Sequence, residues 1–417
     1  MASPDAVWSD GQVGTVTRHH GWWTLEDRFR SPWHYLPVEV PPGALAVRAE
    51  LYYDRSAGVL DLGCLGAAGF RGWSGGARDS FTIMAGAATP GYLPGEPEPG
   101  TWQVIIGIYR LPLEGVEYRL TVEVGTSPGA FALPPAEPPA PPLPRPPRRE
   151  LPAAPGRRWL AGDLHSHTVH SDGALTVAEL ARLAASQGLD FLAVTDHNTV
   201  SHYAELPAAA ARYGLILLPG QEVTIAGGHA GAIGAASWID FRDSADSWLA
   251  ATEQAGGLLS VNHPLGGESS WTLPMQRRPP LAEIWHWTWL DPHWTTQLAW
   301  WTAWDPGAIP VGGSDWHRPG PDAPPGNPTT WVECEDDSAE AILAGLRAGR
   351  TAVSAGRDGP VLLRAGGEVV AVDAEGTVLA GPEGPRARVR GPLAAFPAGP
   401  TWYRLLDGTG ATVALCG

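Results

Sequence analysis

The stretch GDLHSHTVHSDG occupies residues 162–173 and gathers three histidines and two aspartates behind a short apolar run. His165 and His167 are two positions apart, so on an extended strand both side chains point to one face and can bind one ion. Imidazoles and carboxylates suit zinc, manganese and iron(II), whereas magnesium prefers oxygen ligands. One such pair is a weak signal, because histidines are also buried for structural reasons, so further ligands must come from the rest of the chain.

The segments after residue 159 alternate between apolar runs and helical patterns. Thr176 and Glu179 form a capping box at the start of a predicted helix, 176–188. The predicted strands begin with the run around 158–165 and continue at 189–197, 214–222, 229–235, 257–264, 282–287 and 308–317. Repeated strand–helix units imply a parallel sheet, open or closed into a barrel.

Polar residues collect at the carboxyl ends of these predicted strands. Because the carboxyl ends of parallel strands meet at one edge, we expect their side chains to converge. The residues are His165, His167, Asp196, His197, Glu222, His229, His263, Asp315 and His317. So many ligand-type side chains in one region predict a metal site rather than a set of structural histidines.

The motifs HSH (165–167), SDG (171–173), TDH (195–197), GQE (220–222), GH (228–229), NHP (262–264) and GSDWH (313–317) resemble those of the polymerase and histidinol phosphatase (PHP) superfamily of metallohydrolases. Their spacing is most similar to the carbaryl-hydrolase-type branch. The resemblance covers residues 159–355. It implies an α/β fold, a distorted (β/α)7 PHP barrel, with two to three divalent ions, Zn²⁺, Mn²⁺ or Fe²⁺.

The resemblance also implies a division of the ligands among three ions. His165, His167, Glu222 and Asp315 would hold the first ion. Glu222 would bridge to a second ion held by His229 and His263, and Asp172, His197 and His317 would hold the third. Each expected ligand position carries a competent donor in this chain.

Three functions are compatible with this site. The first hypothesis is a metal-dependent phosphoesterase acting on a diester or an aryl phosphate ester, since metal ions supply hydroxide and neutralise a phosphoryl group. The second is a carboxylester or carbamate hydrolase that uses the same hydroxide. The third is a non-catalytic, metal-stabilised binding protein. The expected partner of the enzyme is a small-molecule ester.

Several neighbours of the ligands are candidates for catalysis or for positioning. Alternation along a strand points Asp163 and Asp196 away from the ligand face, so each is expected to accept from an imidazole N–H, with general acid as the alternative role of Asp196. His202 could assist a leaving group, although a surface position is the simpler expectation. Arg318, with Arg277 and Arg278 behind it, is the candidate phosphate clamp, and a solvated loop charge is the alternative.

A tryptophan-rich segment offers a pocket wall. Alternation in IWHWTWL (284–290) sends Trp285 and Trp287 to one side, where they can line an apolar pocket together with the neighbouring His286. In TTQLAWWTAW (295–304) the aromatic stripe has helical spacing and is expected to be core.

The flanking regions read as β structure. Residues 1–125 show short β-type runs separated by turns and predict a β-sandwich, 126–158 form a proline-rich linker, 159–355 form the barrel, and 356–417 form a small C-terminal β segment.

The composition excludes several classes of function. The 417 residues carry a formal net charge of -16, so no nucleic-acid polymer is expected as a partner. All basic residues are arginine, which excludes Schiff-base chemistry and a P-loop lysine. With neither a signal peptide nor a membrane-length apolar segment recognised, we expect a cytoplasmic protein without membrane attachment.

Overall fold

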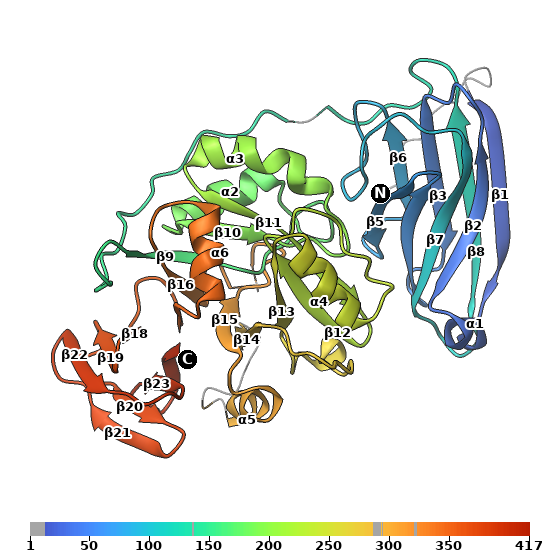
Figure 1. The fold of residues 1–417 in the computed structure, drawn as a ribbon. Coiled ribbons are helices and arrows are strands. Elements are labelled where there is room, and N and C mark those ends of the chain that lie inside the picture. Colours follow the sequence, from blue (N-terminus) through green and yellow to red (C-terminus); the bar gives the residue numbers. More distant parts are fainter. Residues whose placement is uncertain (1–12, 136, 287–292, 294, 321–322) are drawn as a thin grey trace. The chain divides into compact units, whose positions relative to one another are not determined.

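The computed structural model describes residues 13–135, 137–286, 293, 295–320 and 323–417. The chain divides into two compact units, residues 1–138 and 139–417 (Figure 1). The boundary therefore falls inside the segment 126–158 that was predicted as a linker. Within the described residues, no helix is both long and apolar enough to cross a membrane.

Unit 1 consists of two four-stranded sheets and one short helix. The first sheet has the order β1 (Val13–Trp23), β8 (Val116–Gly125), β3 (Ala46–Tyr53) and β6 (Ser80–Met84). The second has the order β2 (Trp33–Val40), β7 (Gly100–Arg110), β4 (Val59–Gly66) and β5 (Gly69–Gly75). Helix α1 (Leu25–Arg30) follows β1 and is capped by Thr24.

The two sheets of unit 1 share one apolar core. Ala49 and Leu51 of β3 lie in the same buried cluster as Val104 and Ile106 of β7. Buried and exposed positions alternate along β3, as expected for strands with one face on a core and one face in water. This arrangement is consistent with the predicted sandwich.

Unit 2 is an α/β unit built on one long mixed sheet. Its strand order begins with β15 (Ile309–Gly313), β14 (Leu281–His286), β13 (Leu258–Asn262), β12 (Gly228–Ile233), β11 (Ile216–Ile225), β10 (Phe191–Val194) and β9 (Arg158–Asp163). It continues with β16 (Thr329–Cys334), β17 (Thr351–Ser354), β24 (Thr412–Cys416), β23 (Tyr403–Leu406), β20 (Val378–Gly381) and β21 (Gly384–Arg388).

The expectation of a wholly parallel sheet is wrong. β9, β10 and β11 pair in parallel, as do β13, β14 and β15, but β12 is antiparallel to both of its neighbours. The physical reason lies in the connection, since only Ala226 and Gly227 separate β11 from β12 and so short a turn can join only antiparallel strands. The hairpin carries two of the predicted ligands, Glu222 on β11 and His229 on β12.

Helices cover the sheet of unit 2. They are α2 (Val177–Ser186), α3 (Leu206–Tyr213), α4 (Ala245–Gln254), α5 (Thr295–Trp304) and α6 (Ala339–Arg347), with 3-10 turns at Ser201–Glu205 and Gly267–Ser269. The predicted capping box of α2 is confirmed, because Thr176 and Glu179 exchange both capping hydrogen bonds. Helices α2 and α3 lie together beside β10 and β11 (Figure 1), and Leu180, Leu192 and Leu206 share one buried cluster.

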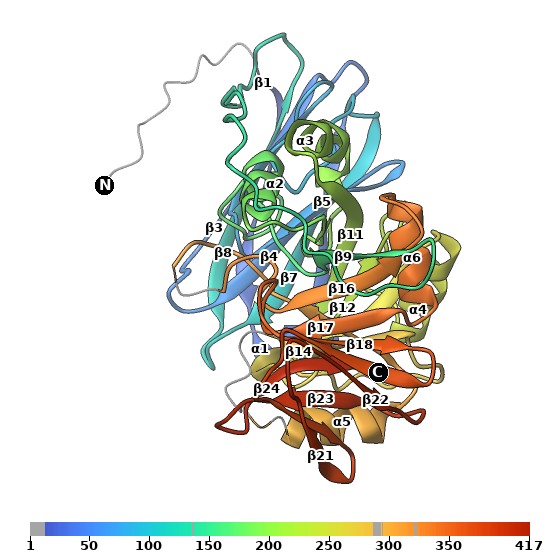
Figure 2. The same ribbon diagram turned by 90° about the vertical axis from the view of Figure 1, so that its left-hand side faces the viewer.

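No strand ladder closes the sheet among the described residues, but an isolated parallel bridge joins Ser166, after β9, to Trp316, after β15. A side chain links the edge strand β15 to the interior strand β16, because the hydroxyl of Thr330 accepts from the Gly312 amide and donates to the Gly312 carbonyl, both at 2.8 Å. The C-terminal strands extend the same sheet beyond β17 (Figure 2), and β18 (Val361–Ala365), β19 (Glu368–Val372) and β22 (Leu393–Pro397) form a separate small sheet.

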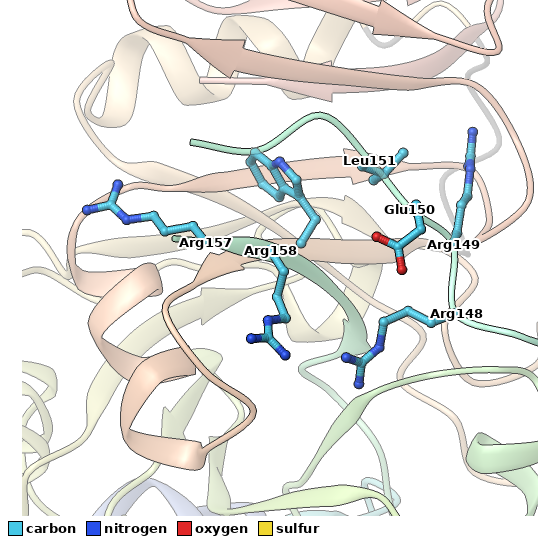
Figure 3. A pocket seen from close by; sticks show the side chains of 7 residues that line it. Arg148, Arg149, Glu150, Leu151, Arg157 and Arg158 are labelled. Carbon is cyan, nitrogen blue, oxygen red and sulfur yellow. The ribbon is translucent and has the colours of Figure 1, made fainter. Parts of the chain in front are cut away.

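The second half of the predicted linker lies against unit 2 without regular secondary structure. Arg145 donates to the Gly214 carbonyl at 2.6 Å, and Arg148 bridges Asp190 and Asp337 at 2.9 and 3.0 Å. Arg148 also lines a small cavity with Arg149, Glu150, Leu151, Arg157, Arg158 and Trp159 (Figure 3). The arginines that line this cavity form ion pairs with carboxylates and hydrogen bonds with carbonyls. These contacts hold the segment at the amino end of β9.

Candidate metal centre

Most of the predicted ligands follow directly after a strand of unit 2. His165 and His167 follow β9, His197 follows β10, His263 follows β13, and Asp315 and His317 follow β15. Backbone hydrogen bonds continue past the strand ends and keep these loops together: the His167 amide donates to the Trp316 carbonyl at 2.9 Å, and the Asn198 amide donates to the Glu222 carbonyl at 2.9 Å.

Glu222 and His229 reach the cluster in a different way from the one predicted. Glu222 lies inside β11 rather than at its end, and His229 lies at the amino end of β12. Because β12 runs antiparallel to β11, the hairpin carries His229 back toward Glu222, and its register pairs Thr224 with His229. The expectation that both ligands mark carboxyl ends of parallel strands is therefore wrong.

The deepest group of ligands surrounds Glu222 and Asp315. The Nε2 atom of His165 lies 3.0 Å from Oε1 of Glu222 and 3.0 Å from Oδ1 of Asp315. The Nε2 atom of His167 lies 2.9 Å from the same Asp315 oxygen and 3.5 Å from Oε2 of Glu222. One ligand atom from each of these four residues lies within 4.8 Å of the others, a separation that one ion can span.

Two further groups adjoin this one. Around Glu222, the Nδ1 atoms of His197 and His229 lie 2.8 and 3.4 Å from its oxygens, and Nε2 of His263 lies 3.2 Å away. Around Asp172, the Nε2 atoms of His317 and His197 lie 3.3 and 3.7 Å from Oδ1. The structure thus brings all nine predicted ligands together, and Glu222 belongs to two of the groups.

Three of these ligand atoms fit a metal ion better than they fit a hydrogen-bonded network. The Nε2 atom of His165, the Nδ1 atom of His229 and the Oε2 atom of Glu222 are buried without a hydrogen-bond partner of acceptable geometry. Buried polar atoms in native proteins are nearly always satisfied, so lone pairs that converge in this way suit coordination of a cation. The residues present therefore fit divalent ions.

Electrostatics also favours a cation at this place. Burial raises the pKa of Glu222, but the imidazoles of His165, His229 and His197 hold that pKa well below its usual range. Burial lowers the pKa of His167 to about 4, helped by the neighbouring imidazoles of His317 and His197. Glu222 is thus ionised and His167 neutral near pH 7, which are the protonation states a metal ion requires.

Two hydrogen bonds fix the orientation of cluster side chains, one at the ring of His317 and one at the carboxylate of Glu222. Nδ1 of His317 lies 2.7 Å from the Asp315 carbonyl, which can only accept, so this nitrogen carries a proton while Nε2 faces Oδ1 of Asp172 at 3.3 Å. Asn262 donates from Nδ2 to Oε1 of Glu222 at 3.0 Å and so orients the shared carboxylate. Asn262 was not singled out from the sequence, although its place before His263 in NHP pointed to it.

Asp196 and His202 form a buried network beside the cluster. Asp196 accepts from the amide and hydroxyl of Thr168 at 2.8 and 2.7 Å and from the hydroxyl of Ser171 at 2.6 Å. His202 is fully buried, with Nδ1 3.1 Å from Asp196 and Nε2 donating to the Val194 carbonyl at 3.1 Å. The expectation of a surface position for His202 is wrong, because Nε2 is bonded to the Val194 carbonyl and Nδ1 faces Asp196, although without a hydrogen bond of acceptable geometry.

Asp163 also departs from its predicted role. Its carboxylate accepts from the backbone amides of His165 and Ser314 at 3.1 Å and of Gly326 at 2.7 Å, rather than from an imidazole. Backbone amides of three loops thereby converge on one buried carboxylate. Asp163 thus holds the end of β9 against the loop that carries Asp315.

The three arginines predicted as phosphate clamps differ in their contacts and exposure. Arg277 is exposed and pairs with Glu253 at 2.6 Å, which corrects its assignment as a free phosphate clamp. Arg278 stacks on Trp304, its guanidinium carbon 3.6 Å from the ring centroid, and Arg318 is exposed directly after His317.

Of the predicted pocket wall, His286 is the residue that reaches the cluster. It is buried, with Nε2 3.3 Å from Oδ2 of Asp315. Trp285 packs against the apolar cluster that contains Ile284 and Trp301, and Trp287 lies outside the described residues. Glu283, which the sequence did not single out, also reaches the cluster and lies 3.2 Å from Nδ1 of His165.

Known proteins resemble short parts of the chain. A 3',5'-nucleoside bisphosphate phosphatase of Chromobacterium violaceum is 47% identical over 67 residues, which are 16% of this chain and 24% of that protein. A 5'-3' exoribonuclease of Haemophilus influenzae is 40% identical over 62 residues, 15% of this chain and 23% of that protein. The chain thus spans about a quarter of the length of these two relatives.

Solved structures resemble it more weakly. A two-domain protein of Bacteroides vulgatus, described as containing a predicted PHP-like metal-dependent phosphoesterase, has a TM-score of 0.45 at 15% identity, covering 65% of this chain and 98% of its own. A putative metal-dependent phosphoesterase of Bifidobacterium adolescentis has a TM-score of 0.31 at 18% identity, covering 39% and 90%.

The family comparison falls on the segment that carries most of the cluster. The matched residues, 163–264, contain every predicted ligand except Asp315 and His317, which follow later in the chain. The family model of the PHP domain matches the chain over these residues, about a quarter of its length.

Proposed function

We propose that unit 2 is a metal-dependent phosphoesterase that hydrolyses a small-molecule phosphodiester or aryl phosphate ester. The observation that supports it is the convergence of nine ligand side chains, several with buried and unpartnered lone pairs, at one place in the α/β unit. Two to three Zn²⁺, Mn²⁺ or Fe²⁺ ions would occupy the three groups. Bound there, such ions supply hydroxide near neutral pH and neutralise the oxygens of a phosphoryl group.

Residues of the chain would direct the approach of substrate, bind a phosphoryl oxygen and position a ligand loop. Asp172 is 46% exposed at its side chain and His317 24%, whereas Glu222 is fully buried, so substrate would approach from the side of Asp172 and His317. Arg318, exposed next to His317, would bind a phosphoryl oxygen. Asp196 would position the loop that carries Asp172, since it accepts hydrogen bonds from Thr168 and Ser171 within that loop.

The relatives support this reading. The named activities of the two curated relatives, a bisphosphate phosphatase and an exoribonuclease, both break phosphoester bonds. Their similarity is confined to about 65 residues, so their substrates are not transferred. The carbaryl-hydrolase-type branch, a barrel-type closure between β15 and β16 and a cytoplasmic location belong to the same proposal.

The test is an ester panel on the full chain loaded with Mn²⁺ or Zn²⁺. We expect bis(p-nitrophenyl) phosphate and p-nitrophenyl phosphate to be hydrolysed, and His165→Ala to lose the activity. Glu333→Gln is the matched control, because this buried carboxylate accepts from the Ala154 amide on the far side of the sheet. Turnover equal to that of His165→Ala on every phosphate ester would refute the proposal, and faster hydrolysis of aryl acetates or carbamates would favour the alternative hydrolase.

A further inference from the structure

Glu283 stands on β14 and touches ligands of two different groups. Its side chain is 2% exposed. Oε1 lies 3.2 Å from Nδ1 of His165, and Oε2 accepts the backbone amide of His263 at 2.6 Å. His165 belongs to the group around Asp315, and His263 approaches the far side of Glu222. One buried carboxylate therefore contacts both groups from behind.

The contact with His165 sets which ring nitrogen is available. Oε1 of Glu283 lies within hydrogen-bonding distance of Nδ1 of His165 and so offers an acceptor for a proton on that ring nitrogen. Nε2 is then left with its lone pair, and this is the atom that lies 3.0 Å from both Glu222 and Asp315. A carboxylate behind a ligating imidazole fixes its tautomer and orientation in this way.

The contact with His263 acts through the backbone. His263 has a φ of 24°, a conformation that side-chain-bearing residues seldom adopt. Its amide donates to Glu283, and its ring places Nε2 3.2 Å from Glu222. The hydrogen bond therefore helps to hold an unfavourable backbone conformation that aims the imidazole at the cluster.

The surrounding strands make room for this carboxylate. The register between β14 and β15 shifts between Glu283 and Trp285, which changes the strict alternation of side chains and turns both Glu283 and His286 toward the cluster. On β15, a Cβ atom added to Gly313 would overlap Oε1 of Glu283 and lie 2.5 Å from Cβ of His165. Glycine at position 313 is thus part of the same arrangement.

We propose that Glu283 is a positioning residue that orients the ligands of two metal ions at once, His165 through its ring and His263 through its backbone. The inference rests on the metal centre of the proposed function but not on its substrate. It assigns Glu283 no contact with substrate or with the reacting atoms.

The test measures Mn²⁺ affinity and stoichiometry of the full chain by titration against a competing chelator. Gln at position 283 keeps one acceptor oxygen and can satisfy only one of the two donors, so Glu283→Gln should weaken binding about 10-fold and Glu283→Ala about 100-fold. The ion assigned to Asp172, His197 and His317 should bind with unchanged affinity in both variants, because none of these three residues contacts Glu283. The binding step that disappears from the titration in Asp172→Asn identifies this ion. A purely structural role would not separate the steps in this way.

Two further variants keep the test decisive. Gly313→Ala, which displaces the carboxylate without removing it, should reproduce the loss, and Glu333→Gln should bind Mn²⁺ like the unmodified chain. Unchanged affinity in Glu283→Gln and Gly313→Ala would overturn the inference while leaving the proposed function intact. An unmodified chain that binds no Mn²⁺ would overturn the metal centre itself, so the two failures are distinguishable.

Discussion

The Nε2 atom of His165 lies 3.0 Å from Oε1 of Glu222, at the meeting point of the loop after β9 and the hairpin of β11 and β12. Neither atom belongs to a well-formed hydrogen bond between the two residues, and Nε2 of His165 is buried without a partner. Both side chains are almost fully buried, at 2% and 0% exposure, and the binding of an ion between them decides the whole functional assignment.

Asp172 should control one ion and not the others. It belongs to one ligand group and is the most exposed member of the cluster, whereas Glu222 belongs to two groups. We expect Asp172→Asn to bind one divalent ion fewer than the unmodified chain and to keep the remaining affinities within a few-fold. Elemental analysis after dialysis measures the stoichiometry, and the complete loss of metal in this variant would contradict the separation of the groups.

Asp196 should act on stability before it acts on chemistry. Removing its carboxylate leaves the donors of Thr168 and Ser171 unsatisfied in a buried place. We expect Asp196→Ala to lower the free energy of unfolding by about 3 kcal/mol, and Asp196→Asn, which keeps one acceptor oxygen, by less. Denaturant unfolding in the presence of EDTA measures both changes, and a loss of activity at unchanged stability would instead support the general-acid role.

The metal-free protein should lose stability as the pH rises above neutrality. Burial lowers the pKa of His317, but Asp172 and Asp315 raise it to about 10, above the ordinary value of 6.5. A raised folded pKa gives a stabilising contribution that is fully present below about pH 6.5 and is lost as the pH approaches 10. His317→Gln should flatten this part of the profile of unfolding free energy in EDTA, and an identical slope in both proteins would exclude His317 as its source.

Metal binding has the opposite pH dependence, because His317 must give up its proton to an ion. Mn²⁺ affinity should therefore increase with pH over the same range in the unmodified chain, with proton release that buffers of different ionisation enthalpy reveal by calorimetry.

Arg318 should influence substrate binding more than turnover. Its exposed guanidinium follows His317 directly, and an arginine clamp that holds substrate and transition state equally affects KM alone. We expect Arg318→Ala to raise KM for a phosphodiester several-fold with little change in kcat. Arg277→Ala is the matched control, since Arg277 already pairs with Glu253, and an equal effect in both variants would contradict the clamp.

Much of this site was accessible from sequence because the ligands follow strands. The apolar runs before His165, His197 and His263 marked strands that the structure contains as β9, β10 and β13, within a few residues of their predicted ends. Where an apolar run predicts a strand correctly, a polar residue at the end of that run can be placed at the carboxyl edge of the sheet.

The remaining features depended on tertiary structure. The register shift after Glu283 breaks the alternation from which Trp285 was predicted to face the pocket, and that shift is a property of the pairing between β14 and β15. The burial of His202 likewise depends on how the connection after β10 folds back, because Nε2 of His202 meets the Val194 carbonyl there. Strand pairing and loop packing of this kind leave no local pattern in the sequence.

The most direct test of the central claim is the metal content of the full chain, measured by elemental analysis after reconstitution with Mn²⁺ and dialysis, beside Glu222→Gln. Glu222 is shared by two ligand groups, so the unmodified chain should retain two to three equivalents and Glu222→Gln at most one. An unmodified chain that retains no divalent ion, or a Glu222→Gln variant that retains as many as the unmodified chain, would contradict the account.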